Sequence, residues 1–185
     1  MKNYFIDAAS QSQANGGLDE APPEPIKNAP ILIVVPASVI SNWGNELRKW
    51  GHFSFETYNN SVDHRERVLE NVKNEKVEIV IVGKSLFSQE TDFDKLKVIK
   101  WKLIIVDEFH EYKNAKSMAH KNIRGIGMFS SFGPIPTIGL TGTLMQNDHK
   151  ELHSLVTLIS PDSFGEWSMV QEDYVVHIKA ARQKT

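Results

Sequence analysis

The chain of 185 residues contains no cysteine, and this absence limits its chemistry. It excludes disulfides, thiolate zinc sites and a cysteine nucleophile, and it fits a reducing compartment. Long hydrophobic runs are also lacking, since the longest, residues 31–35, is far shorter than the ~20 residues of a membrane-spanning helix. The start of the sequence, MKNYFID, has no apolar stretch typical of a secretory signal. We therefore expect a protein that is neither membrane-embedded nor secreted through an ordinary signal.

An excess of charge of one sign is lacking too. Twenty-one Lys and Arg residues stand against 23 Asp and Glu residues, for a net charge of −2. The whole chain therefore does not resemble a polyanion-binding protein, and any nucleic-acid contact must be a local patch. With 41% hydrophobic and 24% charged residues, the composition excludes wholesale disorder and fibrous structure, and the length suits one domain.

The pattern along the chain changes at Pro30. Residues 8–29 are small, polar and acidic, and we expect residues 1–29 to form a flexible lead-in. Beyond them, short β-branched runs alternate with segments of helical periodicity. The alternation predicts strands at 31–35, 52–58, 77–82, 103–106 and 135–140, and helices or helical turns at 38–50, 63–73, 93–99, 115–128 and 151–159. We therefore predict an α/β fold with three layers and a mostly parallel sheet.

Polar residues that directly follow an apolar run are candidates for function, because ligands bind at the carboxyl ends of parallel strands. The sharpest example is LIIVDEFH, where Asp107, Glu108 and His110 follow four apolar residues. An aspartate there can hold Mg²⁺ through water, and a neighbouring glutamate can polarise an attacking water in phosphate chemistry. The alternative is that the two carboxylates cap the next helix and that His110 is a surface residue.

Two further places follow predicted strands. In IGLTGTLMQN, Thr141, Gly142 and Thr143 precede Gln146, and the two hydroxyls could bridge the carboxylates to another site. The alternative is a glycine turn with threonine caps. In VVPASVISNW, backbone N–H groups at a helix start, with Ser38 and Ser41, could grip a phosphate. The alternative there is a plain capped helix.

Together and in this order, the three segments resemble motifs of the Swi/Snf-type DNA-translocating ATPases within helicase superfamily two. LIVVPASVISNWGNELRKWG resembles motif Ia, and LIIVDEFHEYKNAKS resembles motif II, the DExH Walker B box. IGLTGTLMQNDHKELHSLVTLISPDSFG resembles motif III and the helix after it. The similarity runs from about residue 31 to 166. The tail at about residues 173–185, with the segments WGHF and IGLTGTLMQN, resembles most the excision-repair branch, near the Cockayne syndrome group B protein.

The resemblance implies a RecA-like nucleotide-binding lobe that uses ATP and Mg²⁺. Asp107 would hold Mg²⁺ through water, and Glu108 would orient and deprotonate the hydrolytic water. Nucleotide state would be coupled to DNA by five residues: His110, Thr141, Gly142, Thr143 and Gln146. Contacts to double-stranded DNA, expected to be weak and non-specific, would come from Pro36, Ser38, Asn42, Lys113 and Asn114. We expect Trp43 and Trp50 to be core anchors. The resemblance also implies a nuclear protein with partners in a repair or remodelling complex.

A phosphate-binding loop of the form GxxxxGK[ST] is absent from the sequence. Other departures from the family are Phe109 for alanine or glycine, Leu144 for proline, and residues 82–84 for Thr-Thr-Tyr, which puts the DNA contact there in doubt. We therefore expect residues 30–166 to be a partial first ATPase lobe without its phosphate-loop strand. Residues 167–185 would extend toward a second lobe, itself an expected partner, and the chain alone would be inactive. The alternative is a non-catalytic module that binds DNA or protein. A third interpretation, an unrelated α/β hydrolase, is disfavoured because the sequence contains neither a serine elbow nor a cluster of metal-ligating histidines.

Overall fold

The computed structural model describes residues 29–128, 133–143, 148–161 and 163–175, with no side-chain description at 173 and 174. Within these residues the chain forms a five-stranded sheet in the order β2-β3-β1-β4-β5. All four pairs of neighbouring strands are parallel, as predicted. The strands are β1 (Ile31–Val35), β2 (Phe55–Tyr58), β3 (Ile79–Gly83), β4 (Leu103–Val106) and β5 (Thr137–Gly139).

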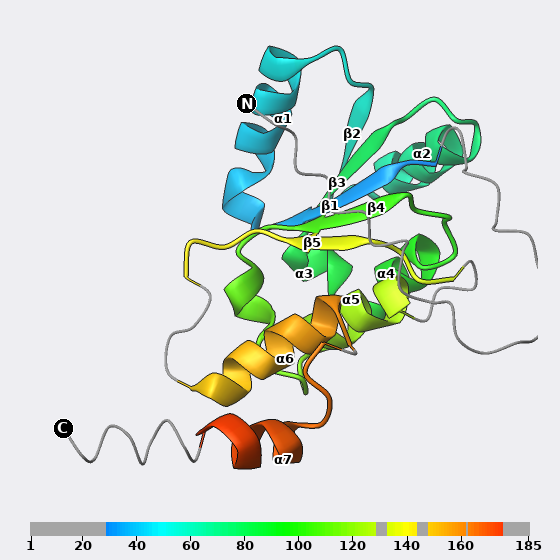
Figure 1. Ribbon diagram of the computed structural model, residues 1–185. Helices are drawn as coiled ribbons and strands as arrows, with labels where there is room; N and C mark the ends of the chain where they lie inside the picture. The colour runs from blue at the N-terminus through cyan, green and yellow to red at the C-terminus, as the bar shows by residue number, and fades with distance from the viewer. Residues whose placement is uncertain (1–28, 129–132, 144–147, 162, 176–185) are drawn as a thin grey trace, which may run out of the picture.

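The helices cover the two faces of the sheet unequally (Figure 1). Helix α1 (Ile40–Trp50) lies on one face, after a short 3-10 turn, η1 (Ala37–Val39). The other face is covered by α2 (Val62–Lys73), α3 (Lys84–Phe87), α4 (Glu90–Leu96), α5 (Met118–Met128) and α6 (His149–Ile159). The remaining turns are η2 (Phe109–Tyr112), α7 (Trp167–Val170) and the π-helical η3 (Gln171–Val175).

Successive residues of β1 belong to different cores, because side chains alternate between the faces of a strand. Leu32 and Val34 join the large core beneath α2–α6. Ile33 and Val35 join the smaller core beneath α1. A strand buried on both sides explains why residues 31–35 read as an unbroken apolar run.

The smaller core corrects one expectation. The apolar contacts of α1 with the smaller core involve Ile40, Trp43 and Leu47. Trp50 lies one turn further on and is 75% exposed, so the prediction that it is a core anchor was wrong. Its indole N–H donates instead to Glu46 of the same helix, at 2.6 Å.

The predicted element boundaries shift by a few residues, and local capping accounts for several ends. The Ser61 hydroxyl accepts a hydrogen bond from the backbone of His64 and starts α2. The Asp148 carboxylate accepts from the backbone of Lys150 and starts α6. The backbone N–H of Gly51 donates to Leu47 where α1 ends, as predicted.

A buried polar cluster that the periodicity did not predict ties three elements together. Asp92 of α4 is 2% exposed, and the Tyr58 hydroxyl of β2 donates to it at 2.8 Å. Arg65 of α2 forms an ion pair with the same carboxylate at 3.3 Å. Burial, reinforced by the hydrogen bond to Asp92, raises the pKa of Tyr58 above its ordinary value.

Strand β5 forms one edge of the sheet within the described part of the chain. Its outer side has no strand partner among those residues. Ile138 of β5 is 45% exposed, and Leu140, just beyond the end of the strand, is 38% exposed. None of the described helices is both long and apolar enough to cross a membrane.

Candidate functional site

The candidate residues gather at the carboxyl edge of the sheet because all the strands are parallel. Asp107 directly follows β4, and Thr141 follows β5. Pro36 follows β1, the neighbour of β4 on its other side. Two hydrogen bonds continue the sheet up to this edge: Asp107 N–H donates to Val34 at 2.9 Å, and Leu140 N–H donates to Val106 at 2.8 Å. The predicted motifs therefore start from neighbouring strand ends.

The Asp107 carboxylate is held by two donors. The backbone N–H of Glu108 donates to Oδ1 at 2.8 Å. The indole N–H of Trp43, on α1, donates to Oδ2 at 2.8 Å. The sequence did not predict this contact, which joins residues 64 positions apart.

Glu108 adopts a left-handed backbone conformation, with φ 47° and ψ 48°. Such a conformation is unfavourable for a residue with a side chain, and strained residues of this kind cluster at functional sites. Glu75, in the turn after α2, is the other described non-glycine residue with a positive φ. The Glu108 side chain is 48% exposed at the strand end and makes no capping hydrogen bond to the η2 turn that follows.

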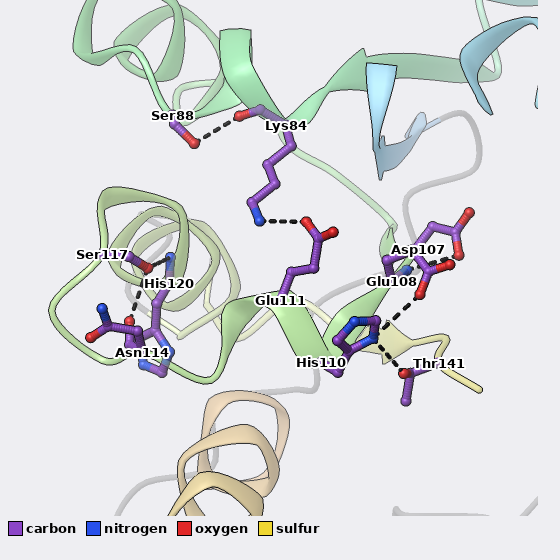
Figure 2. A network of polar contacts seen from close by, with 10 residues as sticks. All are labelled: Lys84, Ser88, Asp107, Glu108, His110, Glu111, Asn114, Ser117, His120 and Thr141. Carbon is purple, nitrogen blue, oxygen red and sulfur yellow. Dashed lines mark hydrogen bonds and ion pairs between the residues drawn. The ribbon is translucent and has the colours of Figure 1, made fainter. Parts of the chain in front are cut away.

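His110 connects the motif II segment to the motif III segment (Figure 2). Its Nδ1 lies 3.0 Å from the Thr141 hydroxyl and 3.3 Å from the Glu108 carboxylate. The Thr141 hydroxyl donates to the Thr143 carbonyl and accepts from the Thr143 N–H, so its oxygen accepts from His110 and Nδ1 carries the proton. His110 is therefore a bridge between the predicted catalytic glutamate and the Thr-Gly-Thr turn.

Phe109 fixes the spacing of the same two segments. Its backbone N–H donates to Leu140 at 2.8 Å, and its buried ring lies against Gly139 of β5. A Cβ at position 139 would lie 2.5 Å from ring atoms, so the large residue at 109 requires glycine at 139. Phe109, which replaces the alanine or glycine usual in the family, therefore occupies space that the absence of a side chain at Gly139 leaves on β5.

Glu111, the residue after His110, forms an ion pair that the sequence did not predict. Lys84, at the start of α3, pairs with Glu111 at 2.5 Å (Figure 2). The Lys84 ammonium also lies over the ring of Tyr112. Burial, with the negative charges of Glu111 and Asp107, raises the pKa of Tyr112 above its ordinary value. His120 Nδ1 lies 2.7 Å from the Tyr112 carbonyl, and burial lowers its pKa despite that bond. Lys84 occupies the place where the sequence departs from Thr-Thr-Tyr, and the structure gives it an acidic partner.

The predicted DNA-binding residues form two separate groups. Ser38 and Asn42 are exposed on η1 and α1, beyond the half-buried Pro36. Lys113 lies beyond His110 and pairs with Glu151 of α6 at 3.0 Å. Asn114 closes a turn, accepting from the backbone N–H groups of Lys116 and Ser117. The last predicted site residue, Gln146, lies outside the described residues.

The site suits a magnesium ion bound mainly by water and phosphate. The described residues hold no group of three or more His, Cys, Asp or Glu side chains that could bind a metal directly. Mg²⁺ in phosphate chemistry needs only one or two carboxylates, because it retains several waters. Each oxygen of Asp107 accepts one hydrogen bond, and its remaining lone pairs suit a metal-bound water.

Comparisons with known proteins find relatives of this chain among chromatin and DNA-repair proteins. The mouse protein "Chromodomain-helicase-DNA-binding protein 1-like" is 31% identical over 137 residues, covering 73% of this chain and 14% of its own length. The mouse "DNA excision repair protein ERCC-6-like 2" is 32% identical over 148 residues, covering 80% of this chain and 9% of its own length. The chain spans less than a fifth of the length of these curated relatives.

A solved structure shows a similar fold. The Sulfolobus solfataricus SWI2/SNF2 ATPase core in complex with dsDNA matches 83% of this chain and 30% of its own, at 26% identity and a TM-score of 0.64. The parallel sheet described above is therefore that of a RecA-like ATPase core, as predicted. The model of the SNF2-related domain matches residues 4–185, and the chain belongs to this family.

Proposed function

We propose that this chain is part of the first ATPase lobe of a DNA-dependent ATPase that acts in chromatin remodelling or DNA repair. The observation that carries the proposal is the bridge of His110 between Glu108 and Thr141, beside Asp107 at the carboxyl edge of the sheet. A helix cap would not need a strained glutamate and a histidine shared with the next strand. The similarity to chromodomain-helicase and excision-repair proteins supports the choice of process, and with it a nuclear location.

In this proposal Asp107 and the residues of the bridge have separate roles. Asp107 would hold Mg²⁺ through water, and the ion would supply positive charge against the phosphates of ATP. Glu108 orients the hydrolytic water and accepts its proton; its exposed position at the strand end suits that role. His110 passes changes at Glu108 to the turn formed by Thr141, Gly142 and Thr143 through its Nδ1 contacts.

The DNA contacts of the proposal lie on two sides of this site. Ser38 and Asn42 offer exposed polar side chains at the start of α1, next to the half-buried Pro36, the third expected contact on this side. Lys113 and Asn114 lie on the other side, and Lys113 must leave Glu151 to reach a phosphate. The solved SWI2/SNF2 core in complex with dsDNA supports DNA as the partner. With a net charge of −2, we expect this binding to be weak and independent of sequence.

Hydrolysis should need residues outside this sequence. A phosphate-binding loop supplies the backbone cradle and the lysine that hold the β- and γ-phosphates, and the sequence contains none. We therefore propose that the loop, and the arginines of a second lobe, come from a longer protein of which this chain is a piece. The same absence supports a second candidate function, a non-catalytic module that keeps the fold and a binding surface.

One experiment separates the two functions. The 185-residue chain and the longer protein encoded around it are each incubated with Mg²⁺, ATP and duplex DNA, and phosphate release is measured. We expect DNA-stimulated release from the longer protein and none from the chain alone. A longer protein that contains a phosphate-binding loop and still releases no phosphate would favour the non-catalytic module. Turnover by the chain alone, above that of its Glu108→Gln variant, would contradict the need for further segments.

A further inference from the structure

Trp43 has an unusual hydrogen-bond partner for a tryptophan of this chain. The indole N–H of Trp101 donates to the carbonyl of Leu96, five residues away, and that of Trp50 donates to Glu46, four residues away. Trp43 instead donates to Asp107, which is 64 residues away and belongs to the candidate site. Trp101 and Trp50 therefore each donate to a residue close in the sequence. The hydrogen bond of Trp43 instead links helix α1 to the end of strand β4.

The position of the Trp43 ring is fixed by packing. Trp43 is half-buried and packs against the smaller core, which contains Ile33 and Val35 of β1. Gly44, the next residue, is buried, and a Cβ there would lie 3.3 Å from the ring of Phe55 on β2. Helix α1 therefore lies close against the sheet, and the direction of the indole N–H is set by the core rather than by a flexible side chain.

The bond also restricts the Asp107 carboxylate. Trp43 holds Oδ2 while the N–H of Glu108 holds Oδ1, so both ends of the carboxylate are occupied by donors from different segments. An indole is a donor only, and its bond to a charged acceptor is stronger than one between neutral groups. Two such donors fix the plane of the Asp107 carboxylate. The lone pairs that accept no hydrogen bond therefore keep one orientation.

We propose that Trp43 is a positioning residue for the metal-binding carboxylate, holding Asp107 in the orientation that accepts the water shell of Mg²⁺. This inference rests on the proposed function for the identity of the ligand, but the contact itself does not. Groups behind a metal ligand that orient it typically change metal affinity about 10- to 100-fold when removed. Trp43 is on this account more than a core anchor.

The first test uses the chain itself and no metal. The four tryptophans give four indole N–H signals in a ¹H–¹⁵N NMR spectrum, and Trp43→Phe identifies the signal of Trp43 by its loss. We expect Asp107→Asn to shift the Trp43 signal and to leave the Trp50 and Trp101 signals in place. A Trp43 signal that keeps its position in Asp107→Asn would overturn the proposal.

The second test uses the longer protein and measures binding rather than turnover. Binding of a fluorescent ATP analogue is followed as Mg²⁺ is raised, for Trp43→Phe and for the matched control Trp50→Phe on the same helix. We expect Trp43→Phe to need about ten-fold more Mg²⁺ for half-maximal binding, with the binding restored at high Mg²⁺, and the control to match wild type. A general loss of folding would lower the amplitude without that shift, and an unchanged Mg²⁺ requirement would overturn the proposal.

The two tests keep this inference apart from the proposed function. If neither the wild-type longer protein nor its variants bind the fluorescent ATP analogue, the proposed ATPase function fails. The NMR signal then still decides whether Trp43 holds Asp107. If nucleotide binds and only the Trp43 shift is absent, the ATPase function stands and the positioning role fails.

Discussion

The ring of Phe109 occupies the space that a side chain at Gly139 would need. Ring atoms lie 2.5 Å from the position of a Cβ at 139, so the first residue of η2 and the last of β5 depend on each other. The contact holds the motif II segment against the motif III strand. His110, next to Phe109, has its Nδ1 3.0 Å from the Thr141 hydroxyl in the same pair of segments.

Gly139→Ala should therefore destabilise the chain. We expect a loss of about 1–3 kcal/mol in the free energy of unfolding, because the added methyl group forces a buried ring to move. Denaturant unfolding measures the loss. Gly142→Ala, where a Cβ meets nothing within 4 Å, is the matched control and should cost much less. In a Phe109→Leu background the cost of Gly139→Ala should shrink; an equal cost in both backgrounds would show that the ring is not the obstacle.

Stability should fall on the alkaline side. Burial raises the pKa of Tyr58 and of Tyr112 above the ordinary value of 10.0. Both hydroxyls therefore stay protonated in the folded state at a pH where the unfolded chain releases the protons, so the free energy of unfolding decreases as pH rises above about 10. Urea unfolding between pH 8 and about 11 measures this decrease. The double variant Tyr58→Phe, Tyr112→Phe should show a shallower pH dependence, and an unchanged slope would contradict the assignment.

Much of the site could be predicted from the sequence, and the reason is local. Asp107, Glu108 and Thr141 each follow an apolar strand, and a parallel sheet brings such ends to one edge whatever the details of packing. The contacts of Trp43 with Asp107 and of Tyr58 with Asp92 could not be predicted in this way. They join segments 64 and 34 positions apart through side-chain directions, which periodicity does not contain. Asp92 lies in the charged sequence ETDFDKL, which gives no sign that this one carboxylate is buried.

The outer edge of β5, which has no strand partner among the described residues, should make the chain alone associate with itself. Unpaired backbone groups along an apolar strand are a template for pairing with another molecule, and Ile138 and Leu140 are exposed there. Light scattering and thermal melting would show association and a broad transition for the 185-residue chain. A protein that carries the neighbouring strand should be monomeric and melt sharply. Ile138→Lys should reduce association of the chain; a wild-type chain that is monomeric with a sharp transition would contradict the prediction.

DNA binding should depend on salt and on the ion pair of Lys113. Affinity should fall steeply as salt rises, because each neutralised phosphate releases counterions, and it should not depend on DNA sequence. Lys113→Ala should weaken binding, whereas Glu151→Gln, which removes its acidic partner at 3.0 Å, should strengthen it. Fluorescence anisotropy with labelled duplex DNA measures both. Lys97→Ala, which breaks an exposed ion pair with Asp94 on α4, is the control. Equal effects of the two lysine variants would exclude a specific role for Lys113.

The measurement that most directly tests the proposed site is the effect of Glu108→Gln on ATP hydrolysis and on ATP binding in the longer protein with a phosphate-binding loop. The exposed Glu90→Gln on α4 serves as the control. Removing the group that accepts the proton of water should lower DNA-stimulated hydrolysis by about 10²-fold or more, while the phosphate-holding groups and Asp107 keep ATP affinity within a few fold. Hydrolysis that persists in Glu108→Gln, or is lost together with ATP affinity, would contradict the role assigned to Glu108.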